Sequence, residues 1–251
     1  MISIHIIESL LTGLVAGFIC GLTGMGGGTI YVPIFYFLFD FSIKKAIGTS
    51  LMVIFISSVF AFLTHLKGGQ INFKMALFLI ISGIIGAQAG SAITAKLPDN
   101  AVKIFFICLT IVLSFNMRRD RKNHVGSGPA QIDLSPVKLI LIGFTGGMIS
   151  GMGGVGGAII LVPLLHLYAG VPINICIGTT LSVVMFNSLS GAAGYLYHGL
   201  VDVQTGALTG LAAIFTAIAG AKVSMKTPTR KLRKIFSVIL LMAGLAVVFW
   251  R

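Results

Sequence analysis

Two clusters of glycine interrupt long apolar runs of this chain. Residues 24–28 read GMGGG and residues 151–157 read GMGGVGG. In an apolar segment water cannot satisfy the backbone groups that a broken helix frees, so protein must bury the break or the break must line a cavity. The helix that follows each break begins with free N–H groups and a dipole that favour an anion. We therefore predict an anion site formed by Gly24, Gly26, Gly27, Gly28, Gly154, Gly156 and Gly157.

Close helix packing is the competing interpretation of these glycines. Glycines spaced by four precede each cluster, at 13, 17 and 21 and at 143, 147 and 151, as is typical of helix-packing faces. Residues 151–156 also match a dinucleotide fingerprint. That pattern requires a preceding strand and a following helix, and we dismiss it in an apolar run.

Hydroxyl side chains recur shortly after each cluster, at the starts of two further apolar runs. A hydroxyl there can cap a helix or donate a hydrogen bond to an anion. An amide and a serine lie deeper in the same runs, and an amide in an apolar helix is costly unless it has a partner or faces a cavity. Capping and bonding between helices remain open beside substrate contact. The candidates are Gly48, Thr49, Ser50, Ser57, Gly178, Thr179, Thr180 and Asn187.

The composition places these residues in a membrane. Of the 251 residues, 56% are hydrophobic and only 10% are charged, and the mean hydropathy is +1.03. Soluble domains carry about 25% charged residues, so an ordinary soluble enzyme is excluded. The net charge of +12 comes from Lys and Arg between apolar runs, which indicates membrane topology and not nucleic-acid binding. We predict an all-α polytopic protein with the lipid bilayer as its partner.

Enzyme chemistry is not expected. The sequence has neither a Cys or His/Glu pair at metal-ligand spacing nor a nucleophile elbow, and no carboxylate lies deep in an apolar run. We predict no catalytic residue, no metal site and no cofactor. The three cysteines lie in apolar segments and are odd in number, so a disulfide framework is not expected either.

The chain reads as an internal duplication. An offset of 130 residues aligns both glycine clusters, Pro33 with Pro163, and Gly48-Thr49 with Gly178-Thr179. We predict one transmembrane domain over residues 1–251, with repeat halves 1–117 and 137–251 joined by a hydrophilic linker at 118–136. Each half begins with a glycine-broken segment.

Basic residues favour inverted halves. If each glycine break turns the chain back, the halves are inverted and 13 of the 18 Lys and Arg fall on one side, including the linker cluster. In a parallel arrangement they divide 10 to 8. Cytoplasmic loops collect Lys and Arg. We therefore predict inverted halves, a cytoplasmic linker and both termini outside.

The motif pair resembles the TauE/SafE (sulfite exporter) family of membrane transporters. The resemblance rests on GLTGMGGGTIYVPI followed by AIGTS, and on GMGGVGGAIILVP followed by CIGTT. It implies a permease of the inner (plasma) membrane for sulfur-containing anions such as sulfite, organosulfonates, sulfoacetate or thiosulfate. In the second half, the residue equivalent to Gly28 is Ala158.

The expected function is therefore transport of a small anion, by alternating access and with a possible proton or sodium coupling ion. A passive anion channel of the same fold is the alternative, and a scaffold is disfavoured by the doubled breaks. The anion, the direction of transport, the coupling ion and the oligomeric state are not encoded in any feature of the sequence.

Overall fold

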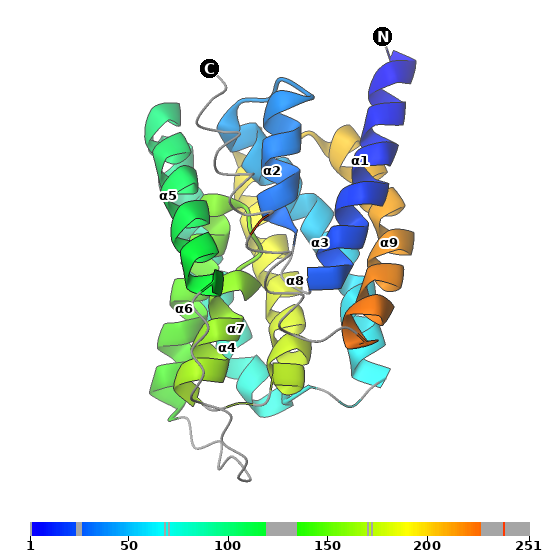
Figure 1. Ribbon diagram of the computed structural model, residues 1–251. Helices are drawn as coiled ribbons and strands as arrows, with labels where there is room; N and C mark the ends of the chain where they lie inside the picture. The colour runs from blue at the N-terminus through cyan, green and yellow to red at the C-terminus, as the bar shows by residue number, and fades with distance from the viewer. Residues whose placement is uncertain are drawn as a thin grey trace.

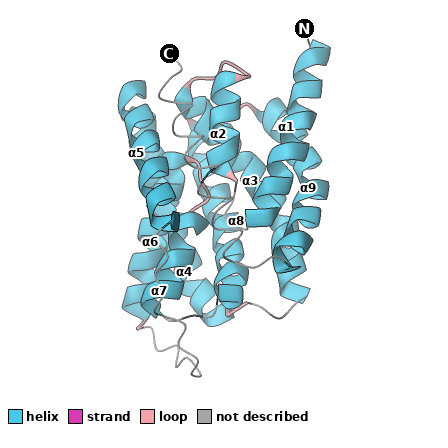
Figure 2. Ribbon diagram, in the orientation of Figure 1, coloured by secondary structure: helices cyan, strands magenta, loops and turns pink. Residues whose placement is uncertain are grey.

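The computed structural model describes residues 2–23, 27–67, 69, 71–118, 135–169, 171, 173–226 and 238. Predicted site residues Gly24 and Gly26, most of the linker and nearly all of the apolar run at 235–250 lie outside the described residues. The described part is helical and contains no strand, with short loops between the helices (Figure 2). The helices are α1 (Ile2–Thr23), α2 (Gly28–Phe37), α3 (Ile43–Lys67), α4 (Phe73–Lys96), α5 (Asp99–Arg118), α6 (Pro136–Gly153), α7 (Ala158–Ala169), α8 (Ile173–Tyr197) and α9 (Val203–Lys226).

Five of these helices are long and apolar enough to cross a bilayer. They contain the segments Ile43–Leu63, Phe73–Lys96, Pro136–Gly153, Ile175–Tyr197 and Val203–Gly220. Large apolar side chains remain exposed on the outside of the bundle, among them Phe215 at 76% and Ile104 at 62%. Such surfaces are what lipid contact requires. The predicted all-helical membrane fold is confirmed, whereas the internal duplication stays a prediction.

Each glycine break turns the chain back on itself. α1 and α2 form a hairpin, because the rings of His5 and Phe39 lie 6.2 Å apart at its open end. At its closed end, Gly27 lies against Cys20 and Tyr31. α6 and α7 form a second hairpin, in which Gly146 lies against Leu161 and Gly157 against Ser150. Figure 1 shows the first hairpin in the upper part of the bundle and the second in the lower part.

α3 and α8 cross the centre of the bundle and pack on each other in opposite directions. Gly48 lies against Tyr195, and Gly191 lies against Leu51. The largest fully buried side chains include Ile47, Leu51 and Ile54 on α3 and Tyr195 on α8. The pair thus forms the core against which the two hairpins close.

Glycine rows bring the remaining long helices together. Gly13, Gly17 and Gly21 of α1 lie against residues 209–217 of α9, in parallel. Gly143, Gly147 and Gly151 of α6 lie against residues 79–91 of α4, also in parallel. A Cβ atom at Gly147 would clash with the backbone carbonyl of Gly83. These rows are therefore packing faces, as their spacing predicts.

This close approach can be tested with two adjacent glycines of α6. The atoms nearest to a Cβ at Gly147 belong to the backbone of α4, whereas the three nearest to a Cβ at Gly146 belong to the side chain of Leu161. Both alanine substitutions gain about 1 kcal/mol of helix propensity. We expect Gly147→Ala to lower the melting temperature by several degrees and Gly146→Ala to lower it much less. Equal melting temperatures for the two variants would contradict the backbone contact.

Candidate functional site

The two glycine breaks meet inside the bundle. Gly27 has a φ of 65°, and Gly154, Gly156 and Gly157 have φ values of 67°, 76° and 88°. L-residues with side chains seldom adopt this left-handed conformation. A Cβ at Gly28 would clash with the carbonyl oxygen of Gly154 and would lie 2.7 Å from the Cα of Val155. The first break therefore packs directly on the backbone of the second.

Each break starts a short helix in the same way. The Gly27 carbonyl accepts the N–H of Ile30 at 2.9 Å and of Tyr31 at 3.1 Å. The Gly157 carbonyl accepts the N–H of Ile160 and of Leu161, both at 3.1 Å. Gly27 has no side chain with which to cap α2, and the first N–H groups of a helix have no acceptor within it. Buried N–H donors and positive dipole ends thus lie at both breaks.

Ser50 joins the first half to the second break. Its hydroxyl donates to the carbonyl of Ile47 and to the carbonyl of Gly154, both at 2.9 Å. One observed role of Ser50 is therefore to hold α3 against the break between α6 and α7. Its counterpart by sequence, Thr180, bonds only within its own helix among the described contacts, donating to Cys176 at 2.7 Å and Ile177 at 3.1 Å.

Thr49 and Thr179 make matching contacts at opposite ends of the bundle. Thr49 Oγ1 accepts the backbone N–H of Asp202, and Thr179 Oγ1 accepts the backbone N–H of Asn72, each at 3.0 Å. Asp202 immediately precedes α9, and Asn72 immediately precedes α4. Both threonines are fully buried. Each threonine therefore holds the start of a helix in the other half of the chain. This role differs from both roles expected from the sequence, capping of their own helix and contact with substrate.

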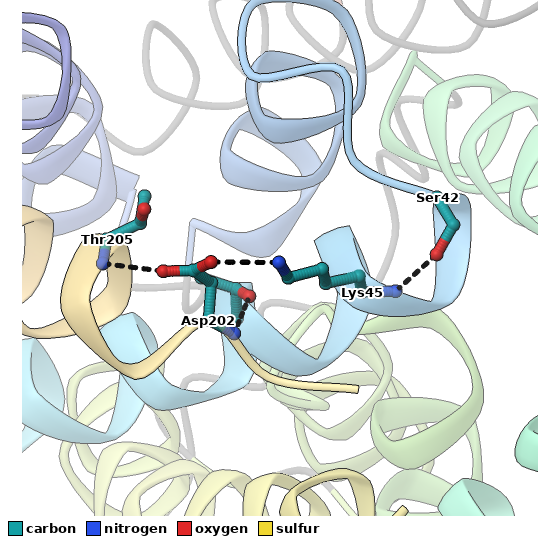
Figure 3. Close-up of polar contacts among 5 residues, drawn as sticks. Ser42, Lys45, Asp202 and Thr205 are labelled. Carbon is teal, nitrogen blue, oxygen red and sulfur yellow. Dashed lines mark hydrogen bonds and ion pairs between the residues drawn. The ribbon is translucent and has the colours of Figure 1, made fainter. Parts of the chain in front are cut away.

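At one of these ends the contact includes an ion pair. Lys45 Nζ lies 2.8 Å from Asp202 Oδ2, and Asp202 Oδ1 accepts the N–H of Thr205 at 3.0 Å (Figure 3). Burial raises the pKa of the Asp202 carboxyl group. Hydrogen bonds from Lys45 and Thr205 and the positive charge of Lys45 together lower it by more than burial raises it, so the pKa lies below its usual value. The carboxylate is therefore ionised at neutral pH.

The remaining predicted residues are all buried, but the described contacts do not bring all of them to the breaks. Gly48 packs against Tyr195, and Ser57 donates to the carbonyl of Ile54 at 3.2 Å. Asn187 lies against Gly83 of α4, about one turn of α8 before Gly191. Gly178 is buried near the start of α8.

Several buried polar side chains have no hydrogen-bond partner among the described residues. Two of them, Thr29 and Tyr31, follow the first break directly. Asn187 has neither amide atom bonded, which is costly in an apolar interior. The others are Ser150, Ser188 and Thr209. Thr29, Tyr31 and Ser150 are not among the residues predicted from the sequence, although Thr29 and Tyr31 lie one and three residues after the first break and Ser150 immediately precedes the second.

The hydrogen-bond donors around the breaks are therefore uncharged groups. Backbone N–H groups at two helix starts and nearby hydroxyls can hydrogen-bond the oxygens of a small anion without a full positive charge. Within the described part of the chain, no cluster of three His, Cys, Asp or Glu could hold a metal ion.

The comparisons with known proteins agree with this architecture of a multi-pass membrane transporter. The sequence profile described as sulfite exporter TauE/SafE matches residues 9–247. The chain therefore belongs to the TauE/SafE family, a family of membrane transporters, and is a multi-pass protein of the cell membrane. The predicted resemblance is confirmed.

Three curated relatives match over nearly their whole length. A probable membrane transporter protein of Methanocaldococcus jannaschii is 28% identical, covering 94% of this chain and 92% of its own. The probable membrane transporter protein YunE of Bacillus subtilis is 25% identical, covering 96% of both chains. One from Haemophilus influenzae is 27% identical, covering 96% of this chain and 97% of its own. No solved structure gives a significant match.

The bonds of Thr49 and Thr179 predict a stability effect that is independent of ligand. Thr→Val at either position keeps the shape but leaves the N–H of Asp202 or Asn72 unpaired, at a cost of about 1–3 kcal/mol. We expect a lower melting temperature without ligand for each Val variant and a near-normal value for each Thr→Ser variant. A Val variant as stable as the wild type would contradict the bond.

Proposed function

We propose that this protein moves a small sulfur-containing anion across the plasma membrane by alternating access. The anion binds beside the contact between the two glycine breaks. The observation that carries the proposal is the direct packing of Gly28 on Gly154 and Val155, which puts the start of α2, with no side-chain cap, against the break that precedes α7. Two positive dipole ends at a buried site favour a negative charge.

The chemistry of the site supports an oxyanion. Backbone N–H groups and hydroxyls match the oxygens of sulfite, thiosulfate, sulfoacetate or another organosulfonate, whereas a cation prefers carbonyl and carboxylate oxygens. We assign the anion contacts to the predicted glycines of both breaks, with Thr29 and Asn187 as the first side chains to test. Ser50 positions the second break through its bond to Gly154. A proton or sodium ion is the expected coupling ion.

Alternating access fits halves that are inverted in the membrane. α3 and α8, and likewise α4 and α9, have bounds that differ by 130 residues. α1 runs parallel to α9, and α6 runs parallel to α4, whereas α3 runs antiparallel to α8. The matching bonds of Thr49 and Thr179 fall at opposite ends of the bundle. These directions support inverted repeat halves, 1–117 and 137–251, that share one central site.

Unpartnered side chains give a direct test of the site. Thr29→Val and Asn187→Leu remove polar groups that have no partner among the described residues. We expect both variants to keep or gain stability without ligand. Each should bind anion at least about tenfold more weakly, because hydrogen bonds to a charged group are lost. The measurement is thermal stabilisation of the purified protein by sulfite, thiosulfate and sulfoacetate.

Thr110→Val is the matched control. Thr110 is a buried hydroxyl on α5 that donates to the carbonyls of Phe106 and Ile107 in its own helix. It should leave anion affinity unchanged. Wild-type affinity in both test variants would move the site elsewhere, and no stabilisation of the wild type by any sulfur anion would overturn the substrate class.

The inverted arrangement predicts which end of the bundle faces the cytoplasm. Lys74 lies near the start of α4 and Asn100 near the start of α5, both exposed and at opposite ends of α4. In a cysteine-free background, Lys74→Cys should react with a membrane-impermeant maleimide only after the cells are opened. Asn100→Cys should react in intact cells. The reverse pattern, or equal labelling, would contradict the predicted orientation.

A further inference from the structure

The two ends of the bundle share a backbone contact but differ in charge. At one end the N–H of Asp202 bonds Thr49, and Lys45 pairs with the Asp202 carboxylate. At the other end the N–H of Asn72 bonds Thr179 in the same way. An offset of 130 pairs Asp202 with Asn72 and Lys45 with Ile175, so the counterpart of this ion pair is uncharged.

The ion pair is not needed to hold these helices together. The contact between α4 and α8 is made without it, and the side chain of Asn72 caps α4 by accepting the N–H of Met75 at 3.0 Å. The side chains of Lys45 and Asp202 are 35% and 27% exposed. Partly exposed ion pairs contribute little to stability. A purely structural role therefore does not explain why the Lys45–Asp202 ion pair is present at one end of the bundle.

Two series of contacts link Lys45 to the glycine breaks. It precedes Thr49 by one turn on the same face of α3. Ser50, the next residue, bonds the Gly154 carbonyl of the second break. Lys45 Nζ lies 4.4 Å from the centre of the Phe41 ring. Rings of Phe41, Phe35 and Tyr31 then follow α2 back to the first break, with centroid distances of 6.2 and 6.1 Å.

We propose that Lys45 is an access site for the transported anion at this end of the protein, and that Asp202 competes with the anion for the lysine. An arriving anion takes the place of the carboxylate on the ammonium group and is passed along α3 toward the breaks. When the anion leaves, Asp202 recaptures Lys45. At the opposite end the equivalent residues are Asn72 and Ile175, so no lysine occupies the equivalent position there.

This inference rests on the proposed function. It predicts that substitutions of the two partners change anion affinity in opposite directions. Removing the cation with Lys45→Gln should weaken binding of thiosulfate and of sulfoacetate at least about tenfold. Removing the competitor with Asp202→Asn should strengthen binding about twofold to fivefold. Asn is the residue at the equivalent position 72 and is a good helix cap, so the fold tolerates it. Lys45→Arg should retain binding.

The double variant Lys45→Gln/Asp202→Asn separates competition from a general change in charge. Without the lysine there is nothing to compete for, so its affinity should equal that of Lys45→Gln alone. A gain from Asp202→Asn that persists without Lys45 would overturn the proposal.

A neighbouring ion pair provides the control. Lys44 Nζ lies 3.3 Å from Asp99 Oδ1 and 3.3 Å from the carbonyl of Ala95, at the same end of the bundle. Lys44→Gln and Asp99→Asn should leave anion affinity unchanged. If the wild type binds and Thr29→Val weakens binding, but Lys45→Gln and Asp202→Asn have no effect, the access site is wrong and the proposed function stands. If the wild type binds neither anion, both fail.

Discussion

Backbone groups that a helix leaves unpaired must be satisfied in an interior without water. Two helices of this protein stop in the middle of the bundle, and glycines with positive φ turn the chain back at each stop. The freed N–H and carbonyl groups then need partners. The protein meets part of this need by packing one break on the other and by donating the Ser50 hydroxyl to Gly154. The N–H groups at the starts of α2 and α7 are the basis of the proposed anion site.

The helices around the breaks are arranged so that each half supports the other. Ser50 of the first half holds the second break, and Thr49 and Thr179 hold the starts of α9 and α4. Close glycine contacts, α1 with α9 and α6 with α4, pack these helices side by side. A rotation of one half against the other would therefore act on the breaks and on both ends together. This is the coupling that alternating access requires.

Much of the architecture follows from the sequence, because hydropathy and glycine spacing are local signals. The apolar runs predict the long helices, and the rows at 13–21 and 143–151 predict their packing faces. The GMGGG and GMGGVGG motifs identify the family. The roles of Thr49 and Thr179 could not be predicted, because their partners lie 153 and 107 residues away in the chain. The position of Thr29 directly after the first break is visible in the sequence, but its burial without a partner among the described residues is a result of packing and could not be predicted.

We propose that one anion binds where the two breaks meet. The most direct test is a structure of the protein with 2-bromoethanesulfonate, located by the anomalous signal of bromine. We expect a peak beside the contact between the two breaks, with sulfonate oxygens in hydrogen-bond contact with the N–H groups that follow Gly27 and Gly157. A peak outside the bundle, or in contact with only one half of the chain, would contradict it.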